Sequence, residues 1–164
     1  MRRILIIIKC FGVRNLLLKI FNKRFRKVYP FKNSFYDIHK NASVFIEKQF
    51  SFNVKWSNHD HRSSLLIMRK NSKLIVKDFN IYSGAQITIN QNAELILNTG
   101  YINHNVNISC FEKIQIGNNV AISENVTIRD SDNHKVSNSN IVKAPIIIED
   151  DVWIGGHVII MPGL

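Results

Sequence analysis

A chain of 164 residues has room for one folded domain with a substantial core. Its 45% hydrophobic and 21% charged residues exclude an intrinsically disordered protein. The two cysteines, Cys10 and Cys110, lie far apart and form neither a disulfide framework nor a metal-binding motif, so we expect a reducing, cytoplasmic location.

The net charge of +10 is concentrated in residues 1–36, a segment without any acidic residue. Its basic residues are Arg2, Arg3, Lys9, Arg14, Lys19, Lys23, Arg24, Arg26, Lys27 and Lys32. Because the rest of the chain is neutral overall, we expect no nucleic-acid partner. After Gly12, apolar residues fall near helical spacing among these basic residues, which predicts a short basic amphipathic helix. Two interpretations are open, a helix lying on an anionic membrane surface or one packed against its own domain.

A period of six residues dominates the chain over residues 74–164. Its members are Ile75, Ile81, Ile87 and Ala93, then Ile102, Ile108 and Ile114, then Ile116, Ile122 and Ile128, and finally Ile148, Ile154 and Ile160. Neither a helix nor simple strand alternation has this spacing, whereas a coil of three short strands, each with an inward aliphatic residue, does. The pattern therefore predicts an all-β coil of stacked repeats over 74–164, with weaker, irregular early coils over 37–73.

The polar stretch 130–143 interrupts this period and is predicted to project from the coil as a loop, where chemistry is often found. It contains His134, whose neutral imidazole can accept a proton near neutral pH. Asp130 and Asp132 precede His134 by four and two residues. Either carboxylate could orient the imidazole, or both could serve only in loop solvation or turn capping.

The run Ile114–Ile128, the loop with Asp132-Asn-His134, and the final Pro145–Gly163 segment with Val-Trp-Ile-Gly closely resemble the hexapeptide-repeat acyltransferases. Within that family the resemblance is to sugar O-acetyltransferases, those that acetylate maltose, galactosides, capsule or lipopolysaccharide. It implies a left-handed parallel β-helix, acetyl-CoA as the co-substrate, and acetyl transfer to a hydroxyl of a sugar or cell-surface polysaccharide. It also implies a homotrimer with active sites between subunits.

The same resemblance assigns roles to individual residues. His134 matches the general base, and Asn103 matches an asparagine that contacts the reacting acceptor oxygen. Trp153 matches an indole beside the acetyl-CoA path, followed by Gly155 and Gly156, where the backbone N–H of Gly156 is implied to stabilise the oxyanion. The chain departs from the galactoside enzymes at Phe111, where they have a sugar-contacting acid, so the same acceptor is not expected.

Two alternative functions accompany this interpretation. A zinc lyase of the γ-carbonic anhydrase type would use His104, His134 and His157, but these lack that family's paired-histidine motif, so no metal is expected. The other alternative is a truncated, non-catalytic β-helix remnant. Relatives continue beyond the Pro-Gly turn with coils that complete the CoA site, so a chain ending at Leu164 is expected to be incomplete and poorly active.

Overall fold

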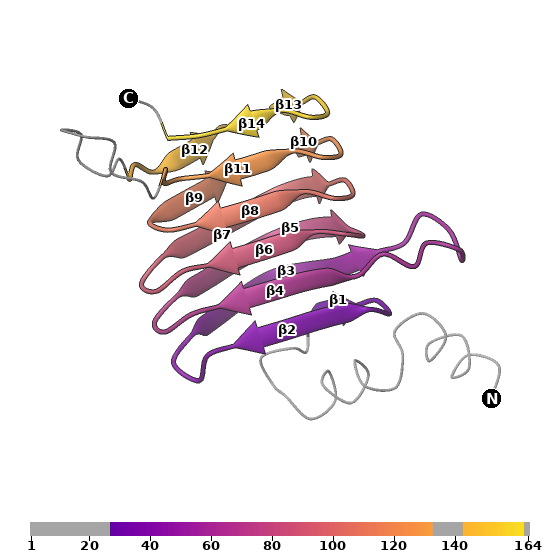
Figure 1. Cartoon of the computed structure of the whole chain (residues 1–164), viewed down its shortest axis with the longest axis horizontal. Helices are drawn as coiled ribbons and strands as arrows, with labels where there is room; N and C mark the ends of the chain where they lie inside the picture. The colour runs from indigo at the N-terminus through magenta and orange to yellow at the C-terminus, as the bar shows by residue number, and fades with distance from the viewer. Residues whose placement is uncertain (1–26, 133–142, 163–164) are drawn as a thin grey trace.

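The computed structural model describes residues 27–132 and 143–162, and every regular element in them is a β-strand (Figure 1). Within these ranges no helix has the length and apolar character needed to cross a membrane. The helix predicted after Gly12 lies outside the described residues. The strands, in chain order, are β1 (Val28–Pro30), β2 (Ser34–Ile38), β3 (Ser43–Val54), β4 (Ser64–Met68), β5 (Lys73–Tyr82), β6 (Gln86–Ile89), β7 (Glu94–Ile102), β8 (Asn107–Cys110), β9 (Lys113–Ile116), β10 (Val120–Ile122), β11 (Thr127–Arg129), β12 (Ile146–Ile148), β13 (Trp153–Ile154) and β14 (Ile159–Ile160).

These strands wind into stacked coils with three sides. The register establishes the sides, because the first half of β7 pairs with β9 whereas its second half pairs with β10. Side one contains the first halves of β3, β5 and β7, followed by β9 and β12. Side two contains β1, the second halves of those long strands, β10 and β13. Side three contains β2, β4, β6, β8, β11 and β14.

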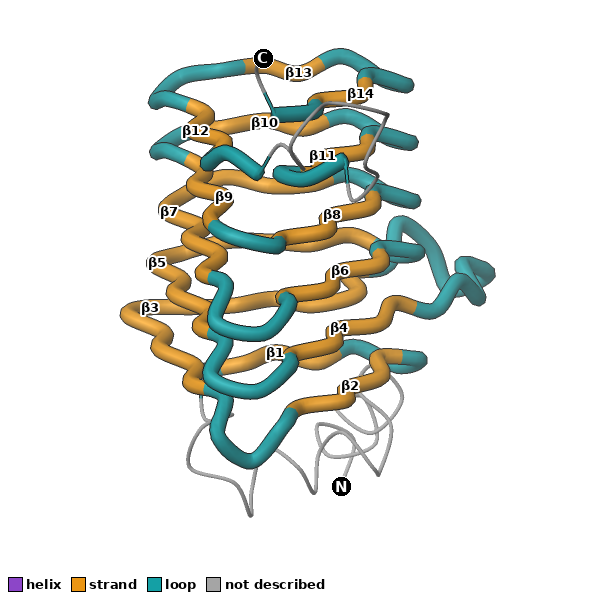
Figure 2. Tube along the Cα trace, turned by 60° about the vertical axis from the view of Figure 1, so that its left-hand side comes forward, coloured by secondary structure: helices purple, strands orange, loops and turns teal. Residues whose placement is uncertain are grey.

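All the pairings between these strands are parallel, and successive coils lie directly above one another (Figure 2). The predicted all-β parallel β-helix is therefore confirmed. Its first coil begins at Val28, inside the segment 1–36 to which the sequence assigned the basic charge. In the range predicted to hold irregular coils, β3 has register shifts between Ile46 and Gln49 and between Phe52 and Val54.

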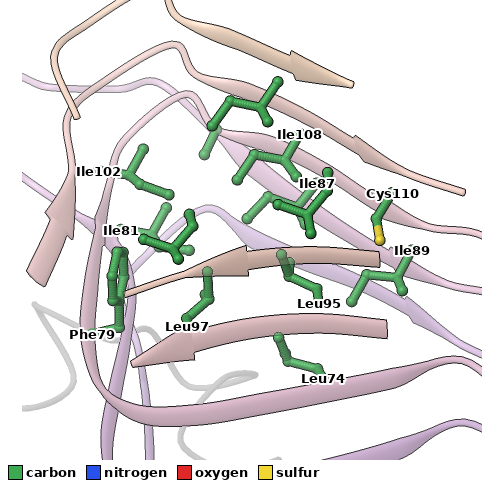
Figure 3. Close-up of a cluster of buried hydrophobic side chains, with 14 of the residues drawn as sticks. Leu74, Phe79, Ile81, Ile87, Ile89, Leu95, Leu97, Ile102, Ile108 and Cys110 are labelled. Carbon is green, nitrogen blue, oxygen red and sulfur yellow. The ribbon is translucent and has the colours of Figure 1, made fainter. Parts of the chain in front are cut away.

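The core is a stack of aliphatic side chains inside the coil (Figure 3). Strand alternation buries every second residue, so one side of a coil contributes two inward side chains, such as Ile87 and Ile89 from β6. The six-residue period identified inward residues correctly with one exception. Ile75 points outward, because β5 buries its neighbours Leu74 and Val76 instead.

Asparagine residues build the corners of the coil. Of the described non-glycine residues with positive φ, most are Asn: Asn33, Asn53, Asn71, Asn92, Asn105, Asn119 and Asn125, with Asp151 and His157 completing the set. Asparagine tolerates this backbone conformation because its short polar side chain makes local hydrogen bonds. We name the corners by the sides they join: the first corner joins sides one and two, the second joins two and three, and the third joins three and one.

Candidate functional site

Most of the side chains that the sequence singled out lie at two of these corners. At the second corner, Asn103 follows the last inward residue of β7, and Gly155 follows the last inward residue of β13. Register places Asn103, Ser123 and Gly155 in one column on successive coils. Coils are separated by the usual strand spacing, so the backbones of Asn103 and Gly155 are about 10 Å apart.

Trp153 lies on the outer face of side two, close to this corner. Its side chain is 76% exposed, and its register partner on the coil below is Ala121, which in turn pairs with Tyr101. Alanine is small, so the indole of Trp153 has no bulky neighbour between it and the next aromatic ring of the column. The exposed indole therefore forms an apolar surface on the outside of side two, along which an elongated molecule could bind.

The two glycines after Trp153 give access to the backbone. A Cβ atom built on Gly155 would meet no heavy atom within 4 Å, so the backbone at Gly155 faces open space. A Cβ atom on Gly156 would lie 3.4 Å from the backbone oxygen of Glu124. A reacting group can therefore approach the main chain closely at Gly155 and with less freedom at Gly156.

Asn103 is held by a residue from far earlier in the sequence. Its Oδ1 accepts a hydrogen bond from the backbone N–H of His104 at 2.9 Å and another from the indole N–H of Trp56 at 3.1 Å. Sequence reasoning missed Trp56, which stands at the start of the loop between β3 and β4. The sequence shows only an aromatic residue directly before a polar stretch, and this pattern indicates no particular partner.

Asp130 belongs to the third corner and is fully buried. It follows β11 in the position that Cys110 occupies after Ser109 in β8, so it takes the place of an inward residue. Its carboxylate accepts hydrogen bonds from the backbone N–H groups of Phe111 at 2.6 Å and Glu112 at 2.8 Å. These contacts are those of turn capping, one of the two roles considered from the sequence.

The thiol of Cys110 lies beside this carboxylate, with Sγ 3.7 Å from Asp130 Oδ2. Burial, followed by the charge of Asp130, raises the pKa of the Cys110 thiol far above its ordinary value. The thiol therefore stays protonated at neutral pH and has the character of a core residue, not that of a nucleophile.

The base of the 130–143 loop is closed by an antiparallel bridge between Ser131 and Lys143. Asp132 follows this bridge, and within the described residues no group hydrogen-bonds to its buried Oδ1. His134 itself lies outside the described residues. The structure thus places Asp132 at the point where the chain leaves the coil toward His134.

The candidate residues form two groups, which lie at different corners of the coil. The turns that carry Asn103, Gly155 and Gly156 lie at the second corner, whereas Asp130 and Asp132 lie at the third, across the width of the coil (Figure 1). A single chain therefore does not bring Asn103 and Trp153 together with the base of the His134 loop.

The remaining histidines of interest belong to the second corner. His104 Nδ1 lies 2.9 Å from Asn103 Oδ1, and His157 Nε2 lies 3.4 Å from Asn125 Nδ2. In residues 27–132 and 143–162, no group of three or more His, Cys, Asp or Glu side chains is arranged to hold a metal ion.

Comparison with known proteins gives one sequence relative and one structural neighbour. The chain is 38% identical over 68 residues to the galactoside O-acetyltransferase of Escherichia coli strain K12, a match that covers 39% of this chain and 34% of that protein. The chain thus spans about a third of the length of the curated relative it matches. No protein-family model matches it.

The structural neighbour is a polysialic acid O-acetyltransferase, with a TM-score of 0.38 and 18% identity over 80% of this chain and 68% of the other. The matched segment therefore shows that part of this chain, which carries a six-residue repeat on parallel coils, is similar in sequence to the galactoside O-acetyltransferase.

Proposed function

We propose that this protein is an O-acetyltransferase that moves an acetyl group from acetyl-CoA to a hydroxyl of a sugar or cell-surface polysaccharide. The observation that carries the proposal is the 68-residue similarity to a galactoside O-acetyltransferase, on a chain built on a six-residue repeat. The arrangement at the second corner supports it, because Asn103, Trp153, Gly155 and Gly156 lie on one outer surface.

In the proposed reaction, the imidazole of His134 takes the proton of the acceptor hydroxyl as its oxygen attacks the thioester carbonyl. The tetrahedral intermediate then collapses, the C–S bond breaks, and the imidazolium returns its proton to the thiolate of CoA. The developing oxyanion is stabilised by the backbone N–H of Gly156. No covalent enzyme intermediate is needed, which agrees with the protonated, buried state of Cys110.

Asp132 is the better of the two candidates for orienting His134. The carboxylate of Asp130 is already bound by the backbone N–H groups of the turn at residues 111–112. Asp132 has a buried Oδ1 without a partner among the described residues, which favours a partner from the loop that follows. A buried acceptor of this kind could hold the N–H of an imidazole and stabilise its charged form.

The active site is proposed to be completed by a second copy of the chain. Since the described ends of the 130–143 loop and the second-corner surface lie across the coil from each other, we propose that His134 of one copy acts together with Asn103 and Trp153 of a neighbour. In a closed trimer with heterologous contacts, the third corner of each copy meets the second corner of the next copy around the ring. We therefore propose a homotrimer, acting in the cytoplasm, with the basic residues that precede β1 available for peripheral contact with the membrane.

The test is acceptor-dependent release of CoA, measured by thiol detection with acetyl-CoA and a panel of methyl glycosides and oligosaccharides. The wild-type chain should release CoA faster with an acceptor present, and mass spectrometry should find one added acetyl group on the glycan. His134→Ala should reduce this rate by a factor of about 10² to 10⁴, whereas His39→Gln, on a distant turn, should not. Release independent of any acceptor, or full activity of His134→Ala, would contradict the proposal.

A further inference from the structure

The loop between β3 and β4, residues 55–63, is an elongated second corner that projects beyond the other turns (Figure 1). It is firmly attached to the coil through Asp60, whose side chain is only 4% exposed. Arg62 forms a two-pronged ion pair with Asp60, with Nε–Oδ1 at 2.9 Å and a second bond at 3.2 Å. The hydroxyl of Ser83 donates to the other carboxylate oxygen, which joins the loop to the next coil.

Further hydrogen bonds fix the two ends of the loop. The Lys55 ammonium donates to the backbone oxygen of Arg62 across its base. Asn53 donates to the backbone oxygen of Lys32 at 2.7 Å and accepts from the hydroxyl of Ser64 at 2.7 Å. Trp56 is therefore carried on a well-supported loop, and the position of its indole is defined.

The indole of Trp56 decides which way the amide of Asn103 faces. An indole N–H and a backbone N–H can only donate hydrogen bonds, so the atom that meets Trp56 Nε1 and His104 N must be the amide oxygen. The amide nitrogen then points the opposite way. Within the described part of the chain Asn103 Nδ2 donates to no protein acceptor, so its N–H groups are available to a ligand.

Trp56 belongs to a row of three aromatic rings. Trp56 stacks on Tyr82 with centroids 4.9 Å apart and planes 20° apart, and Tyr82 meets Tyr101 edge to face at 6.2 Å. Even so, Trp56 is 60% exposed and Tyr101 is 43% exposed. Since Tyr82 covers one face of the indole, the exposed area of Trp56 belongs mainly to its other face and edge.

We propose that Trp56 is a further residue of the acceptor site at Asn103: its indole N–H positions the Asn103 amide, and its exposed face binds the pyranose ring of a glycan. A pyranose has a face of C–H groups that suits an aromatic ring and a rim of hydroxyl oxygens that accept from an amide N–H. Trp56 is then both a contact to the sugar and a positioning residue for Asn103. This inference rests on the proposed acetyl transfer to a sugar, because it adds a residue to that acceptor site.

The test measures glycan binding and catalysis separately on the full chain. Saturation-transfer NMR with methyl β-galactopyranoside, N-acetylglucosamine and N-acetylneuraminic acid, without acetyl-CoA, reports binding alone. Trp56→Phe keeps a ring on Tyr82 but removes the N–H, and Trp56→Ala removes both. Phe35→Leu is the control, since it removes another exposed aromatic ring, from β2 on side three. Circular dichroism confirms that each variant is folded.

At least one probe should show saturation transfer to its ring protons in the wild type and in Phe35→Leu, and none in Trp56→Ala. In the transfer assay, Trp56→Phe should raise the acceptor KM about 3- to 10-fold, as expected for one lost hydrogen bond. It should also lower kcat, since the Asn103 amide is no longer fixed, and leave the KM for acetyl-CoA unchanged. Trp56→Ala should raise the acceptor KM about 10- to 100-fold.

The outcomes separate this inference from the proposed function. Glycan binding that depends on Trp56, in a chain that transfers no acetyl group, would keep the sugar subsite and refute the transferase. Acetyl transfer with an unchanged acceptor KM in Trp56→Ala would keep the transferase and overturn the subsite. Absence of binding by all three probes would also overturn it.

Discussion

Asp130 and Cys110 occupy the same interior column of the coil on successive levels, with the carboxylate 3.7 Å from the thiol sulfur. A charged residue thus stands where neighbouring coils have an apolar side chain. Its cost of burial is offset because the oxygens accept two backbone N–H groups of the turn below, from Phe111 and Glu112. Asp130, which ends the last coil before the polar loop, therefore has a structural carboxylate that holds the turn below it.

Removal of this carboxylate should destabilise the coil. Asp130→Ala leaves two partly buried N–H groups without an acceptor and a gap in the interior column, and we expect it to lower the free energy of unfolding by about 2–4 kcal/mol. Asp150→Ala is the matched control, since Asp150 accepts the backbone N–H of Asn118 at 2.6 Å but lies at the exposed surface. Urea denaturation followed by circular dichroism compares them, and an equal loss in both variants would contradict the assignment.

Stability should depend on pH through Asp60. Burial alone would raise its pKa, but the hydrogen bonds from Arg62 and Ser83 outweigh this and hold the pKa well below its ordinary value of 3.8. Because the folded-state pKa is the lower one, Asp60 stabilises the fold above about pH 4 and loses this contribution as the pH falls through the folded-state pKa.

Asp60→Asn should therefore reduce the free energy of unfolding at pH 7 by about 1.5–3 kcal/mol. The difference from wild type should narrow as the pH is lowered below 4. Asp37→Asn, which breaks an exposed ion pair with Arg69, should have little effect at either pH. A difference between wild type and Asp60→Asn that stays constant from pH 7 to pH 3 would show that the Asp60 charge is unimportant.

The corner conformation gives a third prediction. Asn125 has φ of 57° and accepts a hydrogen bond from Asn105 at 3.3 Å. Asn125→Ala should lower stability more than Asn125→Gly, by about 1 kcal/mol, because a Cβ atom disfavours the left-handed conformation whereas glycine accepts it. Thermal unfolding of the two variants measures this order, and the reverse order would contradict it.

The coil could be predicted from the sequence because a local pattern, an inward aliphatic residue repeated every six positions, specifies it without reference to distant residues. The pattern misplaced Ile75, since on a strand with three consecutive aliphatic residues, Leu74, Ile75 and Val76, the period of six does not determine which ones face inward. The candidate site was less predictable. The contact between Trp56 and Asn103 joins residues 47 positions apart, and its existence depends on how the 55–63 loop folds back on the coil.

The N-terminal charge leads to a prediction about membranes. The described coil begins close to Lys27, so residues 1–26 can be deleted without removing β1. We expect the full chain to co-sediment with phosphatidylglycerol vesicles at low salt, to dissociate as salt rises, and to lose this binding when residues 1–26 are removed. If the full chain does not bind at low salt, the segment does not serve as a membrane contact.

Subunit mixing tests directly whether His134 of one copy and Asn103 of another build one acetyltransferase site. His134→Ala and Asn103→Ala should each be almost inactive as pure proteins. When the two variants are coexpressed in equal amounts, about a quarter of the interfaces in a head-to-tail trimer should combine an intact His134 with an intact Asn103. We expect acetyl-transfer activity near that fraction of wild type, whereas mixed trimers as inactive as either parent would contradict a site shared between copies.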